Sequence, residues 1–431
     1  MAEQKEGIRN KVVTLDSLQF PATAPGAALG GLEATRSEEE SPARMRIERL
    51  EQARERLRQE STAVGDGLMI TVPDREVSLI QSALARDGQA ARNLGGGGGF
   101  EVKFGTGLTG GDIIGWMRSL FDWVDRRQAH PLVRPATTRP DRIENKARIA
   151  MTADWGTGLY GAPKIAAQMN QMAGFDLLLH LGDVYYSGTR EEIQERFLDV
   201  WPKGAGKVSR TLNSNHEMYS GGFGYFELAL PAFGQASSYF ALANDHWLLV
   251  GLDTAYVDHD MDNQQVAWLN AVIRETAGRK VVLFSHQQLF SRLDSQGPKL
   301  HNALRHLLEN KAITAWYWGH EHQCVLYDPH PRYGLFGRCL GNGGIPEARK
   351  QVVRDAPVQS TVGAVTWRRL EATAESPGCI ALDGPNPDIP KANEREKFVP
   401  HGFMTLELDG PTLIERVFLS DGQEILNHRV T

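Results

Sequence analysis

Carboxylate, amide and imidazole side chains follow the apolar runs of this sequence, at the points where those runs end. Asp154 comes directly after the run 147–153, and Asp183 and Tyr186 follow the run 177–181. The second run shows no alternation, which is typical of a strand buried on both faces. In α/β sheets ligands bind at the carboxyl ends of strands, so these side chains are candidate site residues. The further candidates are Asn215, His216, His286, His320 and His322.

This mixture of donor types predicts a metal centre. Carboxylate, amide and imidazole groups together suit borderline-to-hard ions such as Mn, Fe and Zn. No cysteine takes part, which argues against a structural zinc finger. The donors are too many for one ion, whereas a shared carboxylate would let two ions sit about 3.5–4 Å apart. In the pair His320 and His322, at a strand-to-loop transition, alternate side chains can point the same way.

Two such cations would suit the hydrolysis of phosphoesters. These esters resist attack because their anionic oxygens repel a nucleophile and the alkoxide is a poor leaving group. Paired cations neutralise that charge and lower the pKa of a bridging water, giving hydroxide near neutral pH. A histidine such as His216 could add a proton donor, worth roughly 10²–10⁴-fold as general-acid catalysis.

Taken in order, the motifs resemble those of the calcineurin-like metallophosphoesterase superfamily, and most closely its purple acid phosphatase branch. They are D-x-G at 154–156, G-D-x-x-Y at 182–186, N-H-E at 215–217, a single histidine at 286 and G-H-x-H at 319–322. The resemblance covers about residues 147–342. It implies an α/β fold, a four-layer αββα sandwich of two mixed β-sheets with a dinuclear metal site at the C-terminal ends of strands.

The resemblance also implies a role for each candidate. Asp183 would bridge both ions, and His216 would contact the substrate phosphate and assist the leaving group, which makes these two the expected catalytic residues. Independently of the resemblance, Glu217 and Glu321 suit a role outside the ligand set, orienting imidazoles, although ordinary surface carboxylates are an equally good interpretation. The first ion would be held further by Asp154, Tyr186 and His322, and the second by Asn215, His286 and His320.

Two positions depart from the family pattern. Gly156 stands where many relatives have a histidine ligand, so Tyr186 would have to fill that coordination place. If Tyr185 or a water fills it instead, the assignment of iron weakens. Ser214 stands where the family usually has a glycine before the Asn-His pair, which changes the turn slightly.

The expected function is that of a metal-dependent phosphoesterase, which hydrolyses phosphomonoesters or phosphodiesters by attack of a metal-bridging hydroxide. The alternative is a catalytically silent phosphoesterase-fold scaffold that binds a protein partner. The substrate would be a small-molecule phosphoester, and the choice between monoester and diester stays open. Nucleic acid is a conceivable substrate but is not indicated, because the net charge is -6.

Strands and helices alternate through the part of the chain that carries the motifs, which predicts an α/β fold. Residues 402–428, with turns at Asp409-Gly410 and Asp421-Gly422, predict a C-terminal β-hairpin. The predicted strands are 147–153, 177–181, 238–242, 246–252, 280–285 and 312–318, and the predicted helices are 163–172, 190–199, 264–275 and 299–310.

Composition changes along the 431 residues suggest the domain organisation. Residues 1–43 are rich in Ala, Gly, Pro, Ser and Glu, which predicts disorder. Residues 44–146 are expected to form an N-terminal helical extension or cap with a Gly-rich linker. The metallophosphoesterase domain would then span 147–431, with a long insertion at about 342–399.

The cysteine content and the lengths of the apolar runs indicate the cellular compartment. Three cysteines cannot form a disulfide framework and fit a reducing compartment. No apolar run has the length of a signal peptide or of a membrane span. These features predict a soluble, cytoplasmic protein with no membrane contact, and they give no indication of oligomeric state.

Overall fold

A computed structural model describes residues 129–294 and 297–431 and, further towards the N-terminus, residues 11–14, 75, 78–79, 82 and 100–103. The chain divides into two compact units, residues 1–128 and 129–431. In the first unit, β1 (Lys11–Thr14) pairs in parallel with β2 (Phe100–Lys103), so a strand lies in the segment predicted to be disordered. The other predictions for residues 1–128 fall outside the described residues.

Within residues 129–431, the described strands form two mixed sheets, as predicted. The smaller sheet has the order β18 (Glu424–Arg429), β17 (Thr412–Leu419), β16 (Gly402–Asp409), β4 (Lys146–Thr152), β5 (Phe175–His180) and β6 (Gly206–Thr211). The larger sheet has the order β13 (Val358–Val362), β14 (Val365–Leu370), β15 (Cys379–Asp383), β11 (Cys324–Tyr327), β12 (Phe336–Leu340), β10 (Ile313–Trp318), β9 (Lys280–Phe284), β8 (Trp247–Gly251), β7 (Phe240–Ala243) and β3 (Asp141–Arg142).

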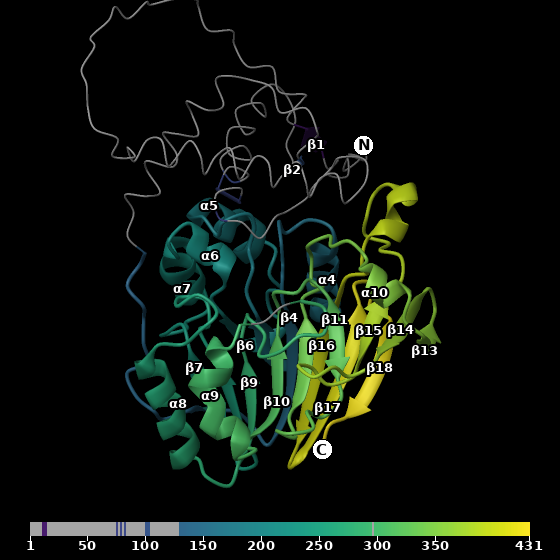
Figure 1. The fold of residues 1–431 in the computed structure, drawn as a ribbon. Coiled ribbons are helices and arrows are strands. Elements are labelled where there is room, and N and C mark those ends of the chain that lie inside the picture. Colours follow the sequence, from purple (N-terminus) through teal and green to yellow (C-terminus); the bar gives the residue numbers. More distant parts are fainter. Residues whose placement is uncertain are drawn as a thin grey trace, which may run out of the picture. The chain divides into compact units, whose positions relative to one another are not determined.

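Helices cover the outer faces of the two sheets, which gives the predicted four layers (Figure 1). The larger sheet packs against α8 (Asn263–Glu275) and α9 (Lys299–Glu309). The smaller sheet packs against α4 (Gly161–Met172) and against α5 (Arg190–Glu192), which continues as the π-helical η2 (Ile193–Leu198). Shorter helical elements are α6 (Asn215–Tyr219), η3 (Tyr225–Ala229), α7 (Leu230–Ala232), α10 (Gln351–Arg354) and the 3₁₀-helical η4 (Ala392–Lys397).

The apolar run in β5 explains why this strand lies inside the smaller sheet, between β4 and β6. Leu177 and Leu179 face the core between the two sheets, whereas Leu178 faces the helical layer. Side chains of a strand alternate between its two faces, so a continuous apolar run satisfies both cores at once. The strand therefore holds the loop that follows it, with Asp183, on a rigid support.

The C-terminal strands complete the smaller sheet. The hairpin of β16 and β17 pairs along eight residues of each strand, and β16 runs antiparallel to β4. Figure 1 shows the yellow C-terminal strands in the same sheet as β4, although β4 comes some 250 residues earlier in the chain. This pairing supports the strand that leads to Asp154.

Two regions of the second unit add to the expected organisation. Residues 342–399, predicted as a long insertion, contain β13, β14 and β15, which extend the larger sheet at one edge. Residues 129–146, predicted as part of the N-terminal extension, belong to the second unit, where β3 pairs with β7. None of the helices in the described parts of the chain combines the length and the apolarity that a membrane crossing requires.

Candidate metal centre

The predicted site residues lie in loops that follow parallel strands of both sheets. Asp154 and Asp183 come two and three residues after the ends of β4 and β5, which are neighbours in the smaller sheet. Asn215 and His216 begin α6, after β6, the next strand of the same sheet. The larger sheet supplies His286 after β9, and it supplies His320 and His322 after the adjacent β10.

Two groups of candidate ligand atoms meet at Asp183. One group consists of Asp154, Asp183 and His322 and the other of Asp183, His286 and His320, and within each group the ligand atoms lie within 4.8 Å of one another. The two carboxylate oxygens of Asp183 face different groups. Oδ1 lies 3.2 Å from Nε2 of His286, and Oδ2 lies 3.9 Å from Nε2 of His322. A single carboxylate is thus placed where it could bridge two cations.

Each group contains further donors at short distances. In the first, Nε2 of His322 lies 3.3 Å from Oδ1 of Asp154. In the second, Nε2 of His286 lies 2.9 Å from Oδ1 of Asn215 and 3.3 Å from Nδ1 of His320. The Asn215 amide nitrogen donates to the hydroxyl of Tyr219 at 2.9 Å, which fixes the amide with its oxygen toward the histidine.

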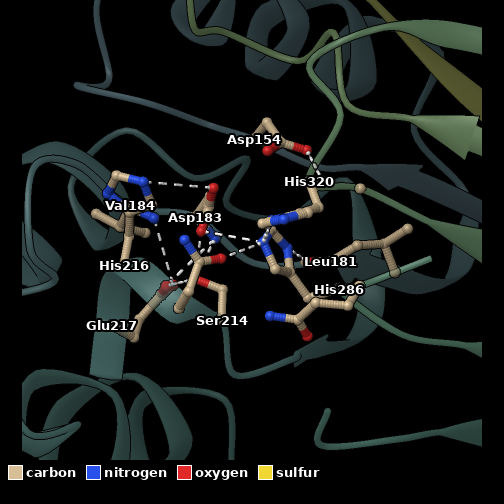
Figure 2. A network of polar contacts seen from close by, with 12 residues as sticks. Asp154, Leu181, Asp183, Val184, Ser214, His216, Glu217, His286 and His320 are labelled. Carbon is tan, nitrogen blue, oxygen red and sulfur yellow. Dashed lines mark hydrogen bonds and ion pairs between the residues drawn. The ribbon is translucent and has the colours of Figure 1, made fainter. Parts of the chain in front are cut away.

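The donor set fits cations. Oδ1 of Asp154 is buried, and its contact with Nε2 of His322 at 3.3 Å lacks hydrogen-bond geometry, an arrangement that is costly unless a cation approaches the oxygen. Burial raises the pKa of Asp154 to about 6, against the opposing effect of His322. Burial also disfavours the charged form of Asp183, but His286 and His216 outweigh it and lower the pKa of that carboxyl. Figure 2 shows the Asp183 carboxylate between His216 and His286.

Main-chain carbonyl oxygens orient two of the imidazoles. Nδ1 of His286 donates to the carbonyl of Leu181 at 2.9 Å, and Nδ1 of His216 donates to the carbonyl of Tyr186 at 2.6 Å. Because a carbonyl oxygen can only accept, each Nδ1 carries a hydrogen and each neutral ring keeps its lone pair on Nε2. His322 is oriented by a side chain instead, since its Nδ1 lies 3.3 Å from Oε2 of Glu347.

Of the two neighbouring tyrosines, the structure brings Tyr185, the alternative to the predicted Tyr186, to the candidate ligand atoms. The hydroxyl of the neighbouring Tyr185 lies 3.0 Å from Oδ2 of Asp183 and 2.7 Å from Nε2 of His322, inside the first group. Tyr186 approaches the site through its main-chain carbonyl, and its ring lies beneath the guanidinium of Arg196 at 5.0 Å. The phenol among the ligand atoms is therefore that of Tyr185, which weakens the assignment of iron.

His216 lies at the edge of the ligand set rather than inside either group. Its Nε2 is 4.0 Å from Oδ2 of Asp183, and its ring packs edge-on against Tyr185 and close to Tyr219. The side chain is buried, and burial lowers its pKa to about 4. The imidazole is accordingly neutral at pH 7, with Nε2 turned toward Oδ2 of Asp183.

The two glutamates predicted to orient imidazoles make other contacts. Glu217 accepts from the main-chain nitrogens of Asp183 and Val184, both at 3.3 Å, and from the Ser214 hydroxyl. The same hydroxyl lies 2.5 Å from Oδ1 of Asp183, so the serine that replaces the usual glycine joins the two carboxyl groups. Glu321 accepts from the indole of Trp318 at 2.8 Å and from the Ser291 hydroxyl.

Positive φ angles concentrate at the site. Eight described residues other than glycine have such an angle, and four of them are the candidate ligands Asp154, Asp183, His320 and His322. A fifth is His259, whose Nε2 lies 3.4 Å from Nε2 of His320. This conformation is strained for most residues, and strained backbone is found mainly where function requires it.

Four contacting residues were not predicted for this site. Tyr185 adjoins a motif position and was an open alternative, and Tyr219 lies four residues beyond Asn215 on the short helix α6. His259 and Glu347 belong to loops outside the motifs, and the sequence contains no spacing signal that would identify them. Only the folded arrangement brings them to the imidazoles.

Comparison with known proteins agrees with the geometry. Residues 147–324 match the family model described as calcineurin-like phosphoesterase. A sequence comparison with curated proteins finds no significant match. Among solved structures, the chain is similar to the purple acid phosphatase PPD1 from yellow lupin (Lupinus luteus), with 14% identity and a TM-score of 0.49 over 68% of this chain and 55% of that one. The similarity thus spans about half of the lupin enzyme.

Two further solved structures are similar to the chain. GAP50, described as the anchor in the inner membrane complex of Plasmodium, has 13% identity and a TM-score of 0.47 over 66% of this chain and 88% of its own. PhoD has 13% identity and a TM-score of 0.38 over 70% of this chain and 73% of its own. The family match confirms the predicted superfamily, while the purple acid phosphatase branch stays a prediction. The family match thus identifies a calcineurin-like phosphoesterase domain in residues 147–324.

Proposed function

We propose that this protein is a phosphoesterase that uses two metal ions to hydrolyse small-molecule phosphomonoesters or phosphodiesters. One observation carries the proposal: the two oxygens of Asp183 face two different groups of ligand atoms. The first ion would be held by Asp154, Asp183 and His322 with the hydroxyl of Tyr185, and the second by Asp183, Asn215, His286 and His320. A soluble, cytoplasmic setting remains our expectation from the sequence.

When bound, a pair of cations supplies charge neutralisation for the phosphoryl oxygens and an activated water for attack on phosphorus. The residues of this chain prepare the site for that chemistry. The carbonyls of Leu181 and Tyr186 direct the Nε2 atoms of His286 and His216 inward. The Glu217 carboxyl accepts from the main-chain nitrogens of Asp183 and Val184. These two contacts hold the Asp183 carboxylate in position between the two groups.

His216 is the proposed group for substrate contact. It is not needed to complete either group of ligand atoms, yet its Nε2 faces the same Asp183 oxygen as His322. Because Nδ1 of His216 keeps its hydrogen for the Tyr186 carbonyl, Nε2 could donate to a phosphoryl oxygen or a leaving-group oxygen in this position only in the imidazolium form. Such a group typically contributes roughly 10²–10⁴-fold to the rate.

The identity of the metal ions is part of the proposal. Carboxylate, amide and imidazole ligands suit Mn, Zn and Fe, and the donor types alone do not choose among them. The phenol of Tyr185 lies among the ligand atoms of the first group, where it could bind an ion as a phenolate. Burial and the nearby carboxylates raise the pKa of this phenol, so it would need a strongly polarising ion to lose its proton.

The test uses the full chain with Mn²⁺ and two chromogenic esters, p-nitrophenyl phosphate and bis-p-nitrophenyl phosphate. We expect hydrolysis of at least one ester, abolished by a chelator, and a loss of roughly 10²–10⁴-fold in kcat for His216→Ala with metal content unchanged. His306→Ala is the matched control, because His306 pairs with Asn270 between α8 and α9, outside the ligand groups.

The two esters also decide between the open alternatives. Preferential turnover of one ester would assign the protein as a monoesterase or as a diesterase. Binding of two ions without turnover of either ester would contradict the proposal and favour the catalytically silent scaffold. Turnover that is unaffected in His216→Ala would leave a phosphoesterase but remove His216 from the mechanism.

A further inference from the structure

The outer nitrogens of the ligand histidines have different partners. Nδ1 of His286 donates to a main-chain carbonyl, and Nδ1 of His322 faces the carboxylate of Glu347. His320 is turned the other way round. Its Nδ1 lies 3.3 Å from Nε2 of His286, on the side of the ligand atoms, and its Nε2 points outward. The outer partner of His320 is a third imidazole, since its Nε2 lies 3.4 Å from Nε2 of His259.

The contacts of His259 fix a direction for the hydrogen bonds. If Nδ1 of His320 keeps its lone pair for an ion, then the hydrogen of this neutral ring is on Nε2 and must be donated outward. Nε2 of His259 is the acceptor, so the hydrogen of His259 is on Nδ1. That nitrogen lies 2.7 Å from Oδ1 of Asp258, which accepts it. The tautomers assigned in this way are mutually consistent from the ligand to the carboxylate.

The loop between β8 and α8 is built to hold His259 in place. The carboxylate of Asp253 accepts from the main-chain nitrogens of Ala255 and Tyr256, at 3.1 and 2.9 Å. Beyond these residues, Val257 and Asp260 form an antiparallel bridge that closes the turn around Asp258 and His259.

Two further interactions tie this turn to the body of the domain. Nζ of Lys299 donates to the carbonyl of Asp258 at 2.9 Å, which joins the turn to the start of α9. His259 itself has a φ of 55°, a strained angle that places its ring against His320. The loop thus fixes the main chain at His259, and the contacts with Asp258 and His320 orient its ring.

We propose that His259, supported by Asp258, is a positioning residue that orients His320 for the second metal ion. This inference rests on the proposed metal centre and adds one element to it, a carboxylate–histidine–histidine chain. Outer partners of a metal-binding histidine fix its tautomer and raise its basicity, and their loss typically lowers metal affinity 10–100-fold. His259 would thus act on the ion of the group Asp183, His286 and His320 and not on the other ion.

The test is a titration of the metal-free full chain with Mn²⁺ by calorimetry. In His259→Ala we expect the Kd of one of the two ions to rise about 10–100-fold while the Kd of the other is unchanged. His259→Gln should recover most of the affinity, because its amide oxygen can reach the position of Nε2 and accept the hydrogen bond. Asp258→Asn should have a smaller effect in the same direction, and His306→Ala should have none.

A second measurement separates positioning from a general loss of structure. Because His259 is partly exposed, metal-free His259→Ala should unfold at the same temperature as the metal-free wild type, and only the stabilisation by added Mn²⁺ should shrink. In the Zn²⁺-loaded protein, long-range ¹H–¹⁵N spectra should show the Nε2–H tautomer of His320 in the wild type and a displaced Nε2 resonance in His259→Ala.

The outcomes for the two proposals are distinct. If the wild type binds two ions and hydrolyses an ester, but His259→Ala binds both ions as tightly as the wild type, the positioning role is overturned and the proposed function stands. A wild type that fails to bind two ions contradicts the proposed function itself. An equal loss of affinity for both ions in His259→Ala would also overturn the inference, because His259 is hydrogen-bonded only to His320 among the candidate ligands.

Discussion

The phenol oxygen of Tyr185 lies 2.7 Å from Nε2 of His322, the nitrogen that also faces the carboxylates of Asp154 and Asp183. The hydroxyl therefore lies among the candidate ligand atoms of the first group. The next residue, Tyr186, contributes a main-chain carbonyl to the site, as the acceptor for His216. The two adjacent tyrosines thus make separate contacts, and substitution of each one should show the difference.

We predict that Tyr185→Phe weakens the binding of one Mn²⁺ ion roughly tenfold or more, as expected when a group that binds or orients a ligand is lost. Tyr186→Phe should leave metal affinity near that of the wild type, because the substitution keeps the carbonyl that accepts from His216. Calorimetric titration of both variants measures the effect. The opposite order, with the larger loss in Tyr186→Phe, would restore Tyr186 as the ligand.

A second prediction concerns Glu347, whose Oε2 lies 3.3 Å from Nδ1 of His322. Removal of this acceptor in Glu347→Ala should weaken binding of the first group's ion, raising its Kd about 10–100-fold. Glu347→Gln keeps an acceptor oxygen, so its affinity for that ion should fall less. The same titration as for His259 provides the measurement. The two substitutions should affect the affinity for different ions, so the double variant Glu347→Ala with His259→Ala should bind both ions more weakly. A double variant with reduced affinity for only one ion would contradict this prediction.

A third prediction concerns the ion pair between the sheets. The guanidinium of Arg338 on β12 lies 2.7 Å from Glu415 on β17, and both side chains are buried. Burial opposes the charge of Glu415, but the attraction of Arg338 and the hydrogen bonds of His428 and Arg338 outweigh it and lower its pKa from 4.5 to about 2. A depressed carboxyl pKa adds stability above the unfolded pKa, and that stability is lost as the pH falls toward the folded pKa.

Glu415→Gln should therefore be less stable than the wild type at neutral pH, by roughly 3–5 kcal/mol, because it leaves the buried Arg338 without its counter-charge. The difference between the two proteins should shrink as the pH falls from 4.5 toward about 2, where the wild-type carboxylate is protonated. Urea unfolding of both proteins across this pH range is the measurement. A difference in unfolding free energy that stays constant over the range would contradict the assigned shift.

The central elements of the fold could be predicted because their residues carry strong local signals. The run Leu177–Leu179 is apolar on both faces, and the structure gives β5 at Phe175–His180. His180, at the end of β5, is buried against Phe197. In contrast, β13 (Val358–Val362) is largely exposed and carries no buried run, so nothing in its sequence distinguishes it from a surface loop.

The candidate ligands could be predicted because each follows a strand within a short motif. Their outer partners could not, since His259 and Glu347 come from separate loops and are identified only by contact with His320 and His322. The choice between Tyr185 and its neighbour depends on how the backbone leaves Asp183, whose φ of 74° no spacing rule supplies. The local sequence pattern thus predicts which candidate ligands share the site, whereas the tertiary structure determines which of their neighbours contact them.

The most direct test of the paired centre is the metal content of Asp183→Asn. Wild-type protein loaded with Mn²⁺ and freed of excess ion should contain two ions per chain by elemental analysis. Since the bridging position requires both carboxylate oxygens of Asp183, the variant should lose the pair and the phosphoesterase activity together. Retention of two ions per chain in Asp183→Asn would show that the cations do not share this carboxylate, and would contradict the account.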